Sequence, residues 1–241
     1  MAAPRIIVHH LAFTRSQRVI WALEELGLKY EIKVHHFARG GMPPGIFALN
    51  PVGKAPVVEI DGKVMVESGA ILHYLLTNYA KPGSGIEQTP SQESYFWALF
   101  SEGTLMFQVQ PGRFVGFTAA YLLKSGGLNE DEKKGVQALN GAWQASVSKT
   151  IKAALGVVEK GLVEHESNGG FFSGNANIGE GDFMMAYPLI DISTMKGAPY
   201  TIGPATRTYL GRVTSRPAFI AAAKRIREEE KANPRPSSGK L

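Results

Sequence analysis

The pattern of apolar residues changes once along this chain of 241 residues, and that change limits the folds it can adopt. In residues 1–80, short β-branched runs alternate with runs of helical spacing. Residues 81–90, KPGSGIEQTP, have the composition of turns and predict a linker. From Gln92 to Lys231 the apolar residues show helical periodicity with interruptions, and no strand-like alternation of useful length. The sequence therefore predicts an α/β domain followed by a larger, all-helical domain.

The α/β part has the predicted order β-α-β, then β-β-α. We expect strands at Arg5–His9 and Tyr30–Val34, a helix from Thr14 to Gly27, an irregular stretch at Phe37–Asn50, strands at Pro56–Ile60 and Lys63–Glu67, and a helix from Ser68. Asp61-Gly62 is a strong signal for a two-residue hairpin turn. In the helical part we expect breaks at Pro111-Gly112, Ser125-Gly126-Gly127, Asn168-Gly169-Gly170 and Gly203-Pro204.

Composition excludes several classes of function. The chain has no cysteine, which rules out disulfide scaffolds, iron–sulfur clusters and cysteine nucleophiles. Its net charge is +5, but the basic residues are scattered, so we expect attraction of small anions and not nucleic-acid binding. No apolar run approaches the roughly 20 residues of a membrane-spanning helix, and no secretory signal is visible, so we expect no membrane partner.

A proline stands directly before the third predicted strand, in the segment NPVGKAPVV. Proline at the start of a strand suits a sheet edge or a tight turn. One solution is a cis bond between Ala55 and Pro56, which would expose the backbone N–H and C=O of Ala55 to a ligand.

Two helix starts carry polar residues suited to binding. Ser68 is the expected N-cap of a helix whose free N–H groups suit a carboxylate, and Glu67 beside it suits an amine. The alternative is an ordinary cap next to a solvated charge. At the first helix, Thr14 and Gln17 fit the capping-box pattern, and a hydroxyl there could also donate to a bound thiolate.

Together these segments resemble the glutathione-binding domain of the cytosolic glutathione transferases. The shared features are a hydroxyl-rich first helix turn, NPxGKxP and ESGAIxxYL, in that order. SEGTLM at residues 101–106 resembles a helix of the microbial, yeast-type subgroup. The segments 173–189 and 209–218 resemble the family's buried capping segment with its core helix and its closing helix. The resemblance covers nearly the whole chain.

The resemblance implies a thioredoxin-like domain at residues 1–80 packed on an α-helical domain at residues 91–241. It also implies a cytoplasmic homodimer in detoxification, which conjugates glutathione to an electrophile. The residues implied to bind glutathione are Lys54 through a carboxylate, Ala55 through its backbone beside cis Pro56, and Glu67 and Ser68 at the γ-glutamyl end. Thr14 or Ser16 would activate the thiol, and glutathione itself would be the nucleophile.

Two positions depart from the family pattern. Thr14 stands where Ser, Tyr or Cys is usual, and its β-methyl restricts the rotamer, so activity is expected to be reduced or redirected. Gly179 stands where Ser or Thr usually caps the helix that carries Asp182. Glycine caps less well by a few tenths of a kcal/mol, so this departure is expected to affect stability more than function.

The acceptor side is expected to be apolar. Four aromatic residues of the helical domain lie in one stretch that should face the cleft in this architecture: Phe107, Phe114, Phe117 and Tyr121. The alternative is that most of them belong to the core.

Two further features of the sequence concern metal binding and location in the cell. Of the pairs His9-His10 and His35-His36, only one member each could converge on one side of a sheet, which is too few ligands for structural zinc, so no metal is expected. The final tripeptide Gly239-Lys240-Leu241 is one residue away from the peroxisomal signal S-K-L, which keeps the peroxisome as an alternative location.

Two functional alternatives share the fold. The same activated thiolate would serve a glutathione-dependent peroxidase or an ether-cleaving lyase, and the first domain does not separate them. Thr14 favours a non-catalytic binding module, since fold alone does not settle function. Retention of Lys54, Glu67 and Ser68 together favours a chain that still binds glutathione.

Overall fold

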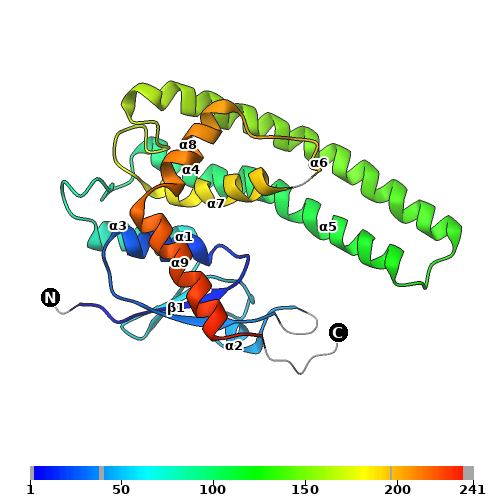
Figure 1. Cartoon of the computed structure of the whole chain (residues 1–241), viewed down its shortest axis with the longest axis horizontal. Coiled ribbons are helices and arrows are strands. Elements are labelled where there is room, and N and C mark those ends of the chain that lie inside the picture. Colours follow the sequence, from blue (N-terminus) through cyan, green and yellow to red (C-terminus); the bar gives the residue numbers. More distant parts are fainter. Residues whose placement is uncertain (1–2, 38–40, 196, 236–241) are drawn as a thin grey trace.

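The computed structural model describes residues 3–37, 41–195 and 197–235 (Figure 1). Its first part holds a four-stranded sheet with three helices: β1 (Ile6–Leu11), α1 (Ser16–Glu25), β2 (Glu31–His35), α2 (Pro44–Phe47), β3 (Val57–Ile60), β4 (Lys63–Val66) and α3 (Ser68–Tyr79). The second part is helical: α4 (Gln92–Phe100), the π-helical turn η1 (Ser101–Met106), α5 (Phe107–Lys124), α6 (Glu130–His165), the 3-10 turn η2 (Glu166–Asn168), α7 (Glu180–Thr194), α8 (Pro204–Thr214) and α9 (Pro217–Ala232).

The sheet has the strand order β2-β1-β3-β4. β1 and β2 are parallel, and β3 is antiparallel to both β1 and β4. The predicted hairpin turn is confirmed: Asp61 and Gly62 have φ angles of 49° and 81°, as a type I′ turn requires. The predicted order β-α-β, β-β-α is therefore confirmed, with the addition of the short helix α2 inside the stretch expected to be irregular.

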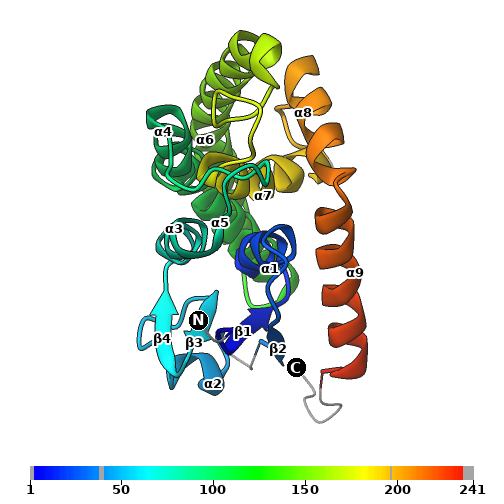
Figure 2. The same ribbon diagram turned by 90° about the vertical axis from the view of Figure 1, so that its left-hand side faces the viewer.

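Helices cover both faces of the sheet. α1 and α3 lie on one face and α2 on the other, while α9 runs down beside α1 (Figure 2). Because β1 lies in the middle of the sheet, its side chains are buried on both faces. The two consecutive histidines of β1 therefore point to opposite faces of the sheet: His9 contacts His35, and His10 contacts Ser16 of α1.

The helical part packs on the first part through α7. This helix contacts α1 and α3 on one side and α4 on the other, and its buried residues include Phe183, Met185 and Leu189. The ring of Phe183 lies 4.5 Å from that of Trp21 in α1. One continuous apolar core therefore joins the thioredoxin-like sheet and the helical bundle.

The expected break at Pro111-Gly112 is wrong. α5 continues through both residues up to Lys124, and Pro111 lies inside it. A proline removes one helical hydrogen bond and needs an adjusted turn beside it. The π-helical turn η1 immediately before α5 supplies such an adjustment. The other expected breaks are confirmed as helix boundaries: residues 125–127 lie between α5 and α6, Gly169-Gly170 follow η2, which ends at Asn168, and Gly203 precedes α8, which begins at Pro204.

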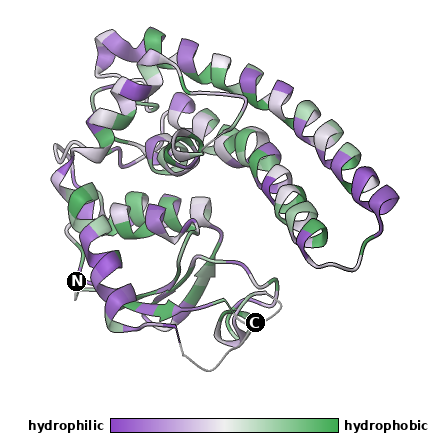
Figure 3. Cartoon of the chain, turned by 45° about the vertical axis from the view of Figure 1, so that its right-hand side comes forward, coloured by the Kyte–Doolittle hydropathy of each residue, from purple (hydrophilic) through white to green (hydrophobic). Residues whose placement is uncertain are grey.

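The longest helices form a projecting hairpin. α6 runs back along α5, and the pair extends away from the rest of the molecule (Figures 1 and 3). Gln144 of α6 donates a hydrogen bond to the carbonyl of Gly112 at 2.7 Å. A Cβ at Gly112 would press on Val147, so the glycine that was expected to break the helix instead permits close packing of α5 on α6.

Gly179 is the N-cap of α7. The expectation that glycine weakens the cap of this helix needs correction. The missing cap is supplied by other residues: Ser94 Oγ of α4 accepts from the N–H of Gly181 at 2.9 Å, and Asp182 reaches back to the N–H of Gly179 at 2.9 Å. A Cβ at Gly179 would collide with Glu87 Oε2 and Ser94 Oγ. Glycine is therefore the residue that this packing requires.

Candidate functional site

Three predicted site segments meet at one edge of the sheet. The antiparallel register places the end of β1 beside the start of β3, and the start of β3 beside the end of β4. The loops that carry Thr14, Pro56 and Glu67 therefore lie at the same edge. Residues far apart in the sequence are brought together there, as the motif order predicted.

The first helix turn differs from its prediction. α1 begins at Ser16, its N-cap is Arg15, and no side chain caps it, so the predicted capping box of Thr14 with Gln17 is wrong. The chain turns sharply at Phe13, with φ of 59°, and Thr14 points back to the end of β1. Thr14 Oγ1 donates to the carbonyl of Leu11 at 2.6 Å and lies 3.0 Å from Ser16 Oγ.

The two candidate hydroxyls differ in access. Ser16 is fully buried, while Thr14 is half-buried. Behind Ser16, at 2.7 Å, lies Nδ1 of His10, whose Nε2 is 3.0 Å from Glu230 Oε1 of α9. Burial lowers the pKa of His10, and the hydrogen bond and charge of Glu230 oppose that effect. Sequence reasoning weighed His10 only as a metal ligand, and no local pattern links it to Glu230.

Ser68 is the first residue of α3 and not its N-cap, which is Glu67 with φ of 67°. The Ser68 hydroxyl turns inward, where it accepts from Arg18 Nη1 at 3.1 Å and donates to the sulfur of Met184 at 3.7 Å. In the part of the chain that the structure describes, no acceptor pairs with the backbone N–H groups of residues 68–70. Because Glu67 and Ala70 are exposed, this helix start is accessible to an anion.

A buried arginine joins the site to the helical part. Arg18 is 1% exposed and donates to Glu102 at 2.6 Å, to Ser101 at 2.9 Å and to the carbonyl of Met184 at 2.7 Å. Arg15 adds a two-pronged pair with Glu102 at 2.9 and 2.7 Å. Burial acts to raise the pKa of Glu102, but the two arginines outweigh it and hold that pKa below its usual value. The sequence singled out residues 101–106 without foreseeing this role.

The segment before β3 matches the expectation for its peptide bond, which is cis between Ala55 and Pro56. Asn50 Nδ2 donates to the carbonyl of Lys54 at 2.9 Å and fixes this loop. Lys54 is exposed, and no carboxylate lies within 4.0 Å of its ammonium group among the described residues. The side chain is therefore open to a ligand carboxylate.

The aromatic stretch is exposed. Phe107 is 66% exposed and Phe114 is 73% exposed, and Phe117 and Tyr121 are similar, so their assignment to the core is wrong. Glu102 contacts Arg15, and a helix rises 1.5 Å per residue. Phe107, at the start of α5, is therefore nearer to the Arg15–Glu102 contact along the helix axis than Phe114.

The histidines do not assemble a metal centre in the described residues. His9 Nδ1 lies 2.9 Å from His35 Nε2, and His9 Nε2 lies 2.7 Å from Glu59. One member of each pair thus meets the other, as predicted. No group of three or more histidine or acidic side chains with metal-binding spacing occurs in residues 3–37, 41–195 and 197–235.

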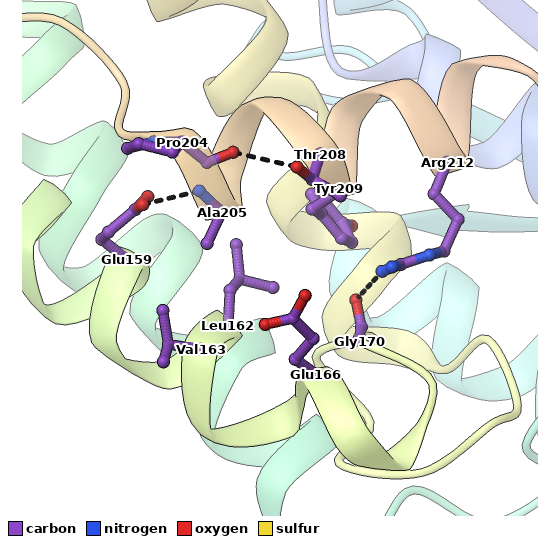
Figure 4. Close-up of a pocket in the computed structure, with 10 residues that line it drawn as sticks. All are labelled: Glu159, Leu162, Val163, Glu166, Gly170, Pro204, Ala205, Thr208, Tyr209 and Arg212. Carbon is purple, nitrogen blue, oxygen red and sulfur yellow. Dashed lines mark hydrogen bonds between the residues drawn. The ribbon is translucent and has the colours of Figure 1, made fainter.

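A hollow of about 350 Å³ lies elsewhere, between α6 and α8 (Figure 4). Glu159, Glu166 and Arg212 line it, and Glu159 accepts from the N–H of Ala205 at 2.6 Å. None of the predicted site residues lines it.

The described helices include none long and apolar enough to cross a lipid bilayer. The tripeptide Gly239-Lys240-Leu241 lies outside the described residues.

Comparisons with known proteins agree with these motifs. A family model described as "Glutathione S-transferase, N-terminal domain" matches residues 9–83. The chain is 44% identical to glutathione S-transferase 3 of Schizosaccharomyces pombe over 105 residues, which cover 42% of this chain and 43% of that protein. It is 25% identical to glutathione S-transferase 1 of Saccharomyces cerevisiae over 236 residues, which cover 94% of this chain and 97% of that protein.

A solved structure supports the fold over most of the chain. The glutathione transferase homologue from Lodderomyces elongisporus, with two GSH per subunit, superposes with a TM-score of 0.63. It is 18% identical and covers 93% of this chain and 99% of its own. At this identity the likeness concerns the arrangement of the sheet and the helices.

Proposed function

We propose that this chain is a member of the glutathione transferase superfamily and that it transfers glutathione to apolar electrophiles, because its first part matches that family's N-terminal domain and its relatives carry that name. Residues 1–80 would form the glutathione-binding domain, residues 81–90 the linker and residues 91–241 the domain that supplies the acceptor site. The observation that carries the proposal is the open N-terminus of α3 beside Thr14 and Pro56 at one edge of the sheet.

The γ-glutamyl end of glutathione fits the start of α3. Its carboxylate would accept from the open N–H groups of residues 68–70, where the positive end of the helix dipole favours an anion. The exposed carboxylate of Glu67 would bind the α-ammonium group. Arg18 holds Ser68 in place and adds a buried positive charge behind it.

The rest of the tripeptide follows the sheet edge. The cysteinyl unit would pair with the backbone of Ala55, beside cis Pro56. Lys54 would bind a carboxylate of glutathione through its exposed ammonium group. This order directs the thiol toward Thr14.

Thr14 is the proposed thiol activator, because its hydroxyl is half-buried at the edge while Ser16 is fully buried behind it. A free thiol with a pKa of about 8.5 is only a few per cent thiolate at pH 7. Lowering that pKa by two units requires about 2.7 kcal/mol of selective thiolate stabilisation. A hydroxyl donor and the start of α1 can supply this in a partly dry site.

The electrophile would approach from the helical side. Phe107 lies closest to the Arg15–Glu102 contact and offers an exposed ring, with Phe114 further out. Exposed aromatic side chains need a reason in a water-soluble domain, and an apolar acceptor is one. These apolar rings would complement the polar groups that bind glutathione, since ligand sites generally combine an apolar lining with a few polar groups.

A cytoplasmic homodimer with a role in detoxification completes the proposal. α4 exposes Tyr95, Phe96 and Leu99 on its outer side, at 55%, 49% and 56%. An apolar strip of this kind suits a self-complementary contact between two copies. Sedimentation of the purified protein tests the dimer independently of the site.

The test of the site is calorimetric titration with reduced glutathione. The wild type is expected to bind, and Glu67→Ala/Ser68→Ala is expected to lose measurable binding. The matched control is Ser91→Ala/Glu93→Ala, which removes the same residue types from the start of α4, where Ser91 accepts from the N–H of Ser94. Failure of the wild type to bind, or equal loss in both double variants, would contradict the proposal.

A further inference from the structure

Four polar groups form a continuous hydrogen-bonded chain from the sheet edge to the last helix. Thr14 Oγ1 lies 3.0 Å from Ser16 Oγ, Ser16 Oγ lies 2.7 Å from His10 Nδ1, and His10 Nε2 lies 3.0 Å from Glu230 Oε1. We call these four residues the relay. They come from the β1–α1 turn, α1, β1 and α9, and His10 and Ser16 in the middle are buried.

The direction of the protons follows from what each group can do. The carboxylate of Glu230 only accepts, so Nε2 of a neutral His10 carries the proton and Nδ1 has a free lone pair. Ser16 must then donate its hydroxyl proton to Nδ1. Thr14 has two acceptors within reach, the carbonyl of Leu11 at 2.6 Å and Ser16 Oγ at 3.0 Å. In the resting arrangement Thr14 donates to Leu11, so transfer along the relay requires its hydroxyl proton to turn from the Leu11 carbonyl to Ser16 Oγ.

Resting on the proposed function, we propose that His10 receives the thiol proton of glutathione through Thr14 and Ser16. The thiol gives its proton to Thr14 Oγ1, Thr14 gives its own to Ser16 Oγ, and Ser16 gives its own to His10 Nδ1. One S–H bond breaks, one N–H bond forms, and both hydroxyls are regenerated. The products are the thiolate and a His10 imidazolium paired with Glu230. His10 and Glu230 are thus positioning residues that act through the two hydroxyls.

The product arrangement supports the thiolate. After the transfer His10 donates to Ser16, Ser16 donates to Thr14, and Thr14 donates outward to sulfur. The neutral resting state of His10 also agrees, because burial lowers its pKa below the usual histidine value. Glu230 of α9 is the titratable group bonded to the ring, and its hydrogen bond and charge favour the imidazolium. His35 of β2 lies on the opposite face of the sheet against His9, and a charge on His10 lowers the pKa of His35.

The neighbouring histidine provides a matched control. His9 is equally buried, at 4% exposed, and also contacts a carboxylate, Glu59, at 2.7 Å. It points to the opposite face of the sheet and contacts His35 instead of a hydroxyl. A change at His9 therefore disturbs a buried, carboxylate-bonded histidine of the same strand without touching the relay.

The experiment counts protons and thiolate separately. Glutathione is titrated into wild type, His10→Gln, His9→Gln and Glu230→Gln. Ultraviolet difference absorbance measures the bound thiolate. Calorimetry in two buffers of different ionisation enthalpy measures the protons released to solvent. A purely structural role for His10 would alter affinity but not the ratio of protons released to thiolate formed.

In the wild type we expect thiolate with much less than one proton released for each thiolate formed. In His10→Gln the pKa of the bound thiol should rise by at least one unit, so that the thiolate fraction at a fixed pH falls about tenfold. His9→Gln should match the wild type. Glu230→Gln, which changes only the charge at the partly exposed end of the relay, should shift the thiol pKa in the same direction and covers the case in which His10→Gln fails to fold.

Release of one full proton for each thiolate in the wild type would overturn the relay, because the proton would then have gone to solvent. An unchanged thiol pKa in both His10→Gln and Glu230→Gln would overturn it as well. Failure of the proposed function is distinguishable, since the wild type would then show neither binding nor thiolate absorbance.

Discussion

The N-termini of α3 and α7 both lack a hydrogen bond from the side chain of their N-cap residue, and the partners of their free N–H groups differ. At α7 the protein supplies acceptors at the helix start: Asp182 accepts from Gly179, Ser94 accepts from Gly181, and the carbonyl of Gly179 accepts from Asp182. At α3 the first hydroxyl is turned inward to Arg18, and the N–H groups of residues 68–70 have no acceptor within the described residues.

The difference separates a structural helix start from a binding one. A buried helix end must be satisfied by the protein, since unpaired buried N–H groups are costly. An accessible end can be left for a ligand. We therefore expect changes at the α7 start to alter stability with little effect on glutathione, and changes at the α3 start to act mainly on glutathione.

The largest expected effect follows from Asp182→Ala. Asp182 is fully buried, and its carboxylate accepts from Phe172 at 2.8 Å and from Gly179 at 2.9 Å. Truncation leaves two buried N–H groups unpaired, which should lower the free energy of unfolding by about 3 kcal/mol. Urea denaturation measures this loss. Glutathione affinity of the folded fraction should be unchanged, and an equal loss of affinity would break the comparison.

The same carboxyl should make stability depend on pH. Burial raises the pKa of Asp182 to about 7, while the N–H groups of Gly179 and Phe172 oppose the rise. The folded state keeps a proton that the unfolded chain, with a carboxyl pKa near 4, has already released. This contribution to stability is complete below about pH 4 and is lost as pH rises through about 7.

Asp182→Asn does not titrate and isolates this effect. The free energy of unfolding of the wild type, relative to that of Asp182→Asn, should fall steadily as pH rises from about 4 to about 7. Urea midpoints at a series of pH values give the difference. A flat difference would show that the carboxyl is ionised throughout and that its two N–H donors outweigh burial.

A smaller loss is expected from Gly179→Ser, which restores the residue that the family usually has. Its Cβ would meet Glu87 and Ser94, so crowding should lower the free energy of unfolding by about 2 kcal/mol. The thermal midpoint of unfolding measures it.

The control is the double variant Gly179→Ser/Ser94→Ala. Ser94→Ala alone should cost about 1 kcal/mol, as loss of a cap does. In the double variant the new hydroxyl can cap α7 and one clash is removed, so the two losses should be less than additive. Full additivity would mean that Ser94 neither caps α7 nor crowds residue 179.

Sequence reasoning recovered the fold because its signals were local. The Asp61-Gly62 turn, the Ala55–Pro56 bond and the start of α3 near Ser68 each depend on adjacent residues. Sequence reasoning failed at Pro111, where the preceding π-helical turn lets the helix continue through a proline. It also failed at the start of α7, where the cap comes from Ser94 of another helix.

The candidate site was only partly predictable for a related reason. Thr14 and Ser16 were found as a pair, but their roles separate only when Ser16 is seen buried against His10. Glu230 reaches His10 across 220 positions of sequence, and Arg18 reaches Glu102 across 84. Such pairs exist only after α9 and η1 have packed on α1, and no spacing in the sequence encodes them.

The smallest effect on stability is expected at the acceptor side, from Phe114→Ala. Phe114 is 73% exposed, so its removal should change the free energy of unfolding by no more than about 0.5 kcal/mol. If its ring contacts the electrophile, KM for an aryl halide should rise while glutathione affinity stays constant. Phe107→Ala, nearer to the Arg15–Glu102 contact, should raise KM more. Unchanged KM values in both variants would contradict contact between these exposed rings and the electrophile.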